Sequence, residues 1–161
     1  MAWDRSGDGD FADNVGGNPE TSVLAALGTS PVCLGAGFAP DGDFAVVWDT
    51  GTSGPTLARD RNGDGDFADA GEIVSLSASP GTVCDAHGMD GFPLAVTHNA
   101  GGTLRLLVDR NDDEDFGDTD EDLFLDAVSP TRAAVARSQT GKTFVAVSTP
   151  TSTTFYADPT P

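Results

Sequence analysis

Apolar and polar residues alternate in short runs along this chain, and Gly, Pro, Asp, Asn or Thr separates the runs. Alternation with a period of two predicts β-strands, because successive side chains of a strand point to opposite faces of a sheet. The separating residues suit tight turns, and the pairs Asp41-Gly42 and Asp90-Gly91 are typical of hairpins. Helical spacing with caps is not evident. The pattern predicts an all-β protein with strands at 23–27, 32–37, 43–48, 56–59, 72–77, 83–88, 93–98, 103–108, 122–125, 133–137, 143–148 and 154–157.

These strands form three units of about 50 residues, a period typical of repeat proteins. Four short antiparallel strands in that length match a β-propeller blade. We expect one repeat domain over residues 1–161, with blades at 32–77, at 83–125, and at 133–157 completed by 1–27. A β-sandwich is the alternative, although it does not explain the regular period. One strand of each unit is rich in small residues and fits the crowded innermost place of a blade: Cys33, Gly35, Ala36 and Gly37; Cys84, Ala86 and Gly88; Ala133, Ala134 and Ala136.

Each unit also carries an acidic loop, and the three loops are near-copies of one another. The first loop covers residues 4–13, the second loop 60–69 and the third loop 109–118. Alternating oxygen-bearing side chains on a tight turn converge on one point, as in a Ca²⁺ site. The sequence therefore predicts Ca²⁺ ligands at loop positions 1, 3, 5, 7 and 10: Asp4, Ser6, Asp8, Asp10 and Asp13; Asp60, Asn62, Asp64, Asp66 and Asp69; Asp109, Asn111, Asp113, Asp115 and Asp118.

Several other features of the loops bear on this prediction. Glu72 and Glu121 lie slightly farther along the chain and are weaker ligand candidates. Acidic turns that bind no metal are the alternative. Two positions besides the carboxylates repeat: we expect Arg5, Arg61 and Arg110 to pair with carboxylates, and Phe11, Phe67 and Phe116 to anchor the loops on their blades.

The segment Asp60-Arg61-Asn62-Gly63-Asp64-Gly65 resembles the Asp-x-Asp-x-Asp-Gly calcium loops of EF-hands, dockerins and bacterial β-propellers of the FG-GAP/VCBS type. The flanking strands favour the propellers, because the other two families place helices beside the loop. The resemblance implies a propeller that binds Ca²⁺. The chain departs from it in two ways: position 12 is Gly71 rather than the Glu of an EF-hand, and the last Asp stands at position 10 rather than 9. In the third loop Asp112 and Glu114 replace both glycines, so we expect weaker binding there.

Charge and missing motifs exclude several functions. The chain has 26 Asp and Glu residues against 8 Lys and Arg, a formal charge of −18. Nucleic acids and anionic membranes require a basic face, so we expect neither as a partner. No apolar run approaches the length of a membrane span. Phosphate loops, zinc motifs and nucleophile elbows are absent, and His87 and His98 occur in one unit only, so we expect no enzyme and structural or solvated histidines.

The two cysteines, Cys33 and Cys84, occupy equivalent places in successive units. We expect buried free thiols that pack as small hydrophobic side chains. A disulfide is the alternative and needs Cα atoms within about 7 Å of each other. The first residues are not a signal peptide, and the resemblance to bacterial propellers favours an extracellular or cell-surface location.

These features predict a calcium-stabilised structural or binding module of a secreted or surface repeat protein, with a glycan or protein as ligand. A propeller lectin is the alternative, with Trp3, Trp48 and Tyr156 as the available aromatic platforms. Propellers typically have four to eight blades, so three cannot close a ring. We therefore expect a homo-oligomer, with a dimer of six blades favoured over larger rings, over a monomer closed in another way and over a fragment of a longer array.

Overall fold

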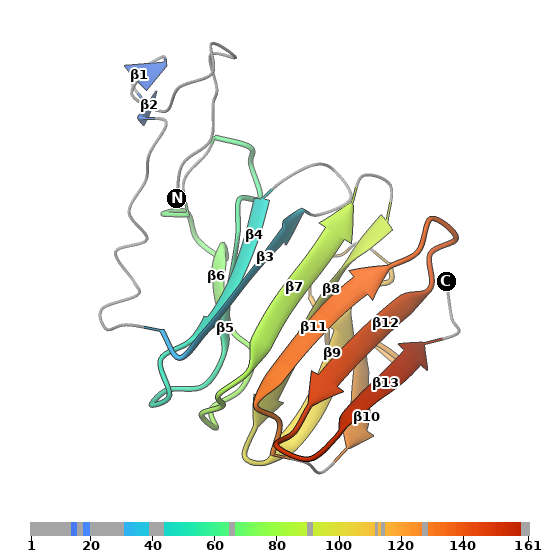
Figure 1. The fold of residues 1–161 in the computed structure, drawn as a ribbon. Helices are drawn as coiled ribbons and strands as arrows, with labels where there is room; N and C mark the ends of the chain where they lie inside the picture. The colour runs from blue at the N-terminus through green and yellow to red at the C-terminus, as the bar shows by residue number, and fades with distance from the viewer. Residues whose placement is uncertain are drawn as a thin grey trace.

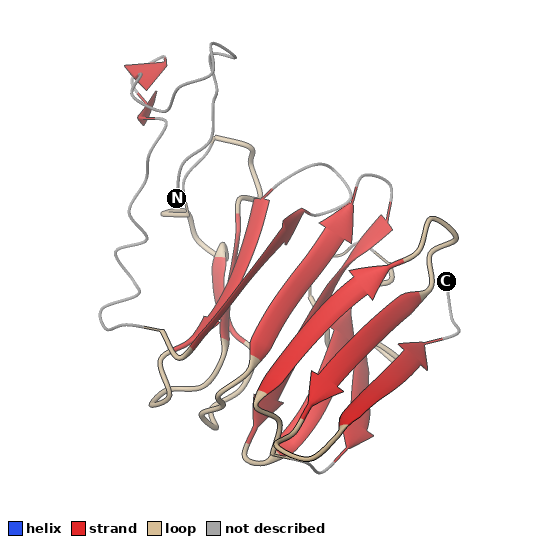
Figure 2. Ribbon diagram, in the orientation of Figure 1, coloured by secondary structure: helices blue, strands red, loops and turns tan. Residues whose placement is uncertain are grey.

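The computed structural model describes residues 14–15, 18–19, 31–38, 44–64, 67–89, 92–111, 113, 115–126 and 129–158. Every regular element in these ranges is a β-strand (Figures 1 and 2), which confirms the prediction of an all-β protein. The strands are β1 (Asn14–Val15), β2 (Asn18–Pro19), β3 (Cys33–Phe38), β4 (Phe44–Asp49), β5 (Thr56–Arg59), β6 (Ile73–Ser75), β7 (Cys84–Met89), β8 (Phe92–Ala100), β9 (Thr103–Val108), β10 (Asp122–Asp126), β11 (Arg132–Arg137), β12 (Thr143–Ser148) and β13 (Thr153–Asp158).

The strand predictions agree closely with these bounds. β5, β9 and β12 have the predicted limits, while β6 is shorter and β8 longer than predicted. The strand predicted at 23–27 lies outside the described residues.

Three antiparallel sheets follow one another along the chain (Figure 1). The first sheet is β3-β4-β5-β6, the second sheet is β7-β8-β9-β10, and the third sheet is β11-β12-β13; β1 and β2 form a separate pair. Within each of the three sheets, strands that follow one another in the sequence are hydrogen-bonded neighbours. Among the described residues these sheets do not close into a ring.

The sheets stack face to face, with an apolar core at each contact. Neighbouring residues of β8 serve different contacts: Val96 faces the first sheet and Ala95 faces the third, as the two-residue period of a strand requires. The first contact buries Ala45, Val47, Leu57, Cys84, Ala86, Val96 and Leu107, and the second buries Ala95, Leu104, Leu106, Val108, Val135, Val145 and Val147.

The strands rich in small residues lie side by side across the stack, β3 beside β7 and β7 beside β11 (Figure 1). A Cβ atom added to Gly35 would lie 2.4 Å from the Cα of Asp85, so only glycine lets β3 approach the β7 backbone this closely. On the other side of β7, Oδ2 of Asp85 accepts a 2.9 Å hydrogen bond from the N–H of Val135. Small residues therefore serve close packing between adjacent sheets.

Cys33 and Cys84 form a disulfide across the first contact, with their Cα atoms 5.5 Å apart. The expectation of two free thiols is therefore wrong. The bond joins β3 of the first sheet to β7 of the second. Structural disulfides are typical of oxidising compartments outside the cytoplasm.

The strand register explains why the two thiols meet. The last strand residue before the acidic loop is Arg59 in the first sheet, where it pairs with Ala45, and Val108 in the second sheet, where it pairs with Ala95. Trp48 and His98 each lie three residues after these partners and are therefore equivalent. Trp48 pairs with Leu34, whereas His98 pairs with Cys84. Cys84 thus corresponds to Leu34, the residue after Cys33, so the expectation that the two cysteines occupy equivalent places is wrong by one residue. A shift of one residue turns a side chain to the opposite face, so the two sulfurs face each other between the sheets.

Candidate metal centre

The second and third loops each join the last two strands of a four-stranded sheet. Residues 60–69 precede β6 and residues 109–118 precede β10. Just beyond each loop, at position 12, the backbone is left-handed, with φ of 92° at Gly71 and 71° at Asp120. Glycine takes this conformation without strain, and Asp is among the side chains that tolerate it best. A sharp reversal therefore stands where an EF-hand loop has its last ligand.

Glu72 and Glu121 follow this reversal and are almost fully buried, with exposed fractions of 2% and 1%. Oε1 of Glu72 accepts the N–H of Arg61 at 3.2 Å, and Oε2 accepts the N–H of Asp69 at 2.9 Å. Glu121 makes the same two bonds in the third loop, at 2.8 and 3.4 Å. Each carboxylate therefore holds the two ends of its loop together, a role that the sequence did not reveal.

Asn62 brings together the side chains at positions 3, 5 and 10 of the second loop. Its Nδ2 lies 3.2 Å from Oδ2 of Asp64 and 2.5 Å from Oδ2 of Asp69, and its Oδ1 accepts the N–H of Asp64 at 2.9 Å. Asn111 makes the same three contacts in the third loop, at 3.0, 2.7 and 3.1 Å. The two loops thus share one geometry, in which the exposed carboxylates converge.

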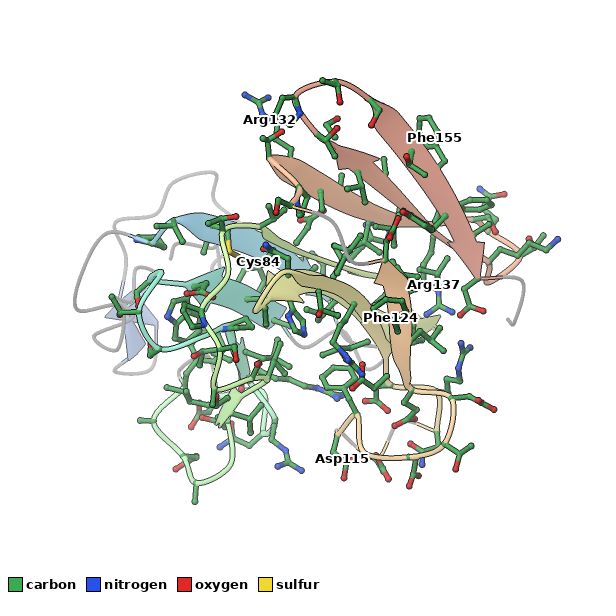
Figure 3. All side chains as sticks on the ribbon, turned by 90° about the horizontal axis from the view of Figure 1, so that it is seen from below. Cys84, Asp115, Phe124, Arg132, Arg137 and Phe155 are labelled. Carbon is green, nitrogen blue, oxygen red and sulfur yellow. A yellow bond between two sulfur atoms is a disulfide. The ribbon has the colours of Figure 1, made fainter. Side chains whose placement is uncertain are left out.

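Three carboxylates associated with the third loop have the spacing of a cation site. One oxygen from each of Asp113, Asp115 and Glu121 lies within 4.8 Å of the other two. Asp113 and Asp115 are exposed, and Figure 3 shows Asp115 in the loop that projects from the second sheet. Oδ1 of Asp115 also accepts the N–H of Gly117 at 2.6 Å. Carboxylate oxygens suit hard cations such as Ca²⁺ and Mg²⁺.

The Asp at position 1 is bonded to an arginine of the preceding sheet. Nη1 of Arg59 lies 3.3 Å from Oδ2 of Asp109, and both side chains are buried. Arg110, at position 2 of the third loop, forms an ion pair with Asp158, which holds the place of position 1 in the third sheet. The predicted pairing of Arg110 with a carboxylate is confirmed, whereas Arg59 was missed because it ends a strand outside the repeated loop positions. Position 1 therefore links adjacent sheets.

The remaining predicted loop residues divide by what the structure describes. Phe67 is buried, and Phe116 packs against the core of the first contact, so both anchor their loops as predicted. The ligand candidates Asp4, Ser6, Asp8, Asp10, Asp13 and Asp66 lie outside the described residues, as do Arg5, Phe11, Asp112 and Glu114.

The fold and the loops define an all-β protein of stacked antiparallel sheets with a repeated acidic loop on the sheets. Comparisons with protein-family models, with curated proteins and with solved structures found no match. None of the described residues forms a helix long and apolar enough to cross a membrane.

Proposed function

We propose that this chain is a calcium-stabilised module of the β-propeller type that serves as a structural or binding unit of a secreted or surface repeat protein. The main support is the shared geometry of the second and third loops. Each has a buried glutamate that joins its ends and an asparagine that draws two carboxylates together. Two loops with the same geometry support the same ligand in both.

Electrostatics supports a cation as that ligand. The chain carries a formal charge of −18, and one oxygen from each of Asp113, Asp115 and Glu121, in and just beyond the third loop, lies within 4.8 Å of the other two. Like charges at this distance repel, and a divalent ion between them converts the repulsion into binding energy. Ca²⁺ is favoured over Mg²⁺, because Ca²⁺ accepts six to eight oxygens in irregular geometry whereas Mg²⁺ demands a near-ideal octahedron.

Thermal melting in EDTA and in millimolar CaCl₂ tests this proposal. An ion that binds only the folded state adds about 2.7 kcal/mol at a hundredfold excess over Kd, which raises Tm by several degrees. NaCl at equal ionic strength controls for screening, and MgCl₂ tests selectivity. Asp64→Asn and Asp113→Asn should each remove part of the Ca²⁺-dependent rise, because each weakens one loop. Coincident curves in EDTA and CaCl₂ would refute the proposal.

The lectin alternative gains little from the aromatic side chains. Trp48 is 3% exposed and lies in a core with Val46, Ala58 and Phe67, so it presents no flat face to a sugar. The hydroxyl of Tyr156 donates a 2.7 Å hydrogen bond to Asp126. Trp3 lies outside the described residues. We therefore propose a structural or binding module, without catalytic activity, ahead of a lectin.

A further inference from the structure

The third sheet has an apolar face that neither of the other two sheets covers. Val145 and Val147 of β12 point toward the second sheet and are buried. Phe144 of β12 and Phe155 of β13 lie on the opposite face, with exposed fractions of 42% and 76%. Figure 3 shows Phe155 on the side of the third sheet that faces away from the rest of the molecule. The cross-strand pairs place Ala134, Ala136, Ala146 and Ala157 around these two rings; we call this surface the open face.

The open face corresponds to surfaces that are buried elsewhere in the same chain. Leu57, Leu106 and Phe155 each stand three residues before the Asp at position 1 of their unit. Leu57 is buried against the second sheet and Leu106 against the third. Each of the first two sheets thus uses the same face to contact the sheet that follows it. Phe155 is at the equivalent position of the third sheet, where contact with a further sheet would bury it.

The other end of the stack carries a complementary surface. In the second sheet Cys84 and Ala86 of β7 face the first sheet and are buried. Leu34 corresponds to Cys84 and is 58% exposed, and Phe38, on the same face of β3, is 51% exposed. On the same face Val46, Trp48 and Ala58 are already buried in a core with Phe67, so β3 carries the apolar surface that is left for a preceding sheet.

We propose that the open face of the third sheet binds the β3 side of the first sheet in a second copy of this chain, repeating the contact made twice within one chain. The contact is head-to-tail, and the smallest ring that uses both ends of every chain has two copies related by a two-fold axis. Closure removes from water the exposed phenylalanines at both ends, which offsets the repulsion between two acidic chains. This inference goes beyond the proposed function and requires no bound cation.

Light scattering on a sizing column, in CaCl₂ and again in EDTA, tests the assembly. The wild-type protein should elute at a multiple of its 16.4 kDa chain mass, and at twice that mass for a two-copy ring. Phe155→Asp should shift the protein to the mass of one chain while its circular dichroism and disulfide stay unchanged. Phe124→Asp is the matched control, since Phe124 is 61% exposed but lies on β10 of the second sheet. A monomeric wild type, or an oligomer that survives Phe155→Asp, would overturn the proposal.

Engineered cysteines test the head-to-tail geometry independently. Arg132 pairs with Ser148 as Cys33 pairs with Asp49, so Arg132 is the counterpart of Cys33 on the third sheet. Leu34 is the counterpart of Cys84. In a chain that carries both Arg132→Cys and Leu34→Cys, the thiol at 132 of one copy should therefore lie beside the thiol at 34 of the next copy, as Cys33 lies beside Cys84 in the native disulfide.

On a non-reducing gel the double variant should form covalent oligomers, and adding Phe155→Asp should abolish them. Each single variant should stay at the mass of one chain. If Arg132→Cys alone forms dimers, the third sheets of two copies contact each other, and the proposed head-to-tail contact is wrong. Failure of the double variant to crosslink also contradicts the proposal.

Discussion

Burial separates the acidic residues of this chain into two groups with different tasks. Glu121 and Asp109 are about 1% exposed, and they hold loop N–H groups and an arginine of the preceding sheet. Asp113 and Asp115 are exposed and converge with Glu121 within 4.8 Å. The buried carboxylates shape the loop, and the exposed ones remain accessible to a cation.

His98 gives the chain a pH dependence at the scale of one residue. The side chain is 1% exposed, and burial lowers its pKa to about 4, although the charge of Asp122 acts in the opposite direction. The unfolded chain takes up this proton near pH 6.5 and the folded chain does so only near pH 4, so stability is lost as the pH falls between these values. The loss approaches about 3 kcal/mol.

Urea unfolding at pH 7 and at pH 4.5 measures this loss. His98→Gln should show a smaller decrease on acidification than the wild type. Equal decreases for wild type and His98→Gln would show that His98 does not carry the effect.

At the scale of elements, the reversal beyond each loop couples the loop to the last strand of its sheet. Gly71 and Asp120 have positive φ and are followed at once by the buried glutamates. This turn lets one carboxylate reach the backbone at both ends of the loop. Loop geometry therefore depends on a residue that the calcium-loop pattern does not contain.

Gly71→Ala tests this dependence. A Cβ in left-handed backbone costs about 1–2 kcal/mol, and here it would also lie 2.9 Å from Nη1 of Arg61. Chemical denaturation should therefore show a loss of that size. Gly71→Asn should lose less, because Asn tolerates this conformation, and Asp120→Gly should lose little. Equal stability of the wild type and Gly71→Ala would contradict the account of the turn.

The strands could be predicted because their signals are local. Alternation and turn residues sufficed for β5, β9 and β12, whose bounds match the prediction. The disulfide depends instead on a register offset of one residue between the first and second sheets, which a sequence repeat of about 50 residues conceals. The Arg59–Asp109 pair likewise depends on which sheets are neighbours.

At the scale of the whole molecule, covalent, ionic and apolar contacts all act between adjacent sheets. The disulfide joins residues 51 apart in the sequence, for which chain entropy predicts a stabilisation of about 4 kcal/mol. The Arg59–Asp109 pair lies at the contact between the first and second sheets, and the Arg110–Asp158 pair lies at the contact between the second and third sheets.

The ligand candidates of the acidic loops were chosen from the loop pattern alone. The role of Glu72 and Glu121 in holding the loop ends could not be predicted, because it depends on their burial against the sheet beneath the loop.

Calorimetric titration of the oxidised protein with Ca²⁺, after removal of bound ions with EDTA, tests the central claim most directly. The account predicts saturable Ca²⁺ binding. Asp64→Asn should lose the ion of the second loop, Asp113→Asn should lose the ion of the third loop, and each variant should bind one ion fewer than the wild type. Mg²⁺ at the same concentration should bind more weakly. Absence of binding heat up to millimolar Ca²⁺, in a protein whose disulfide and circular dichroism are intact, would contradict the claim that these loops are calcium sites.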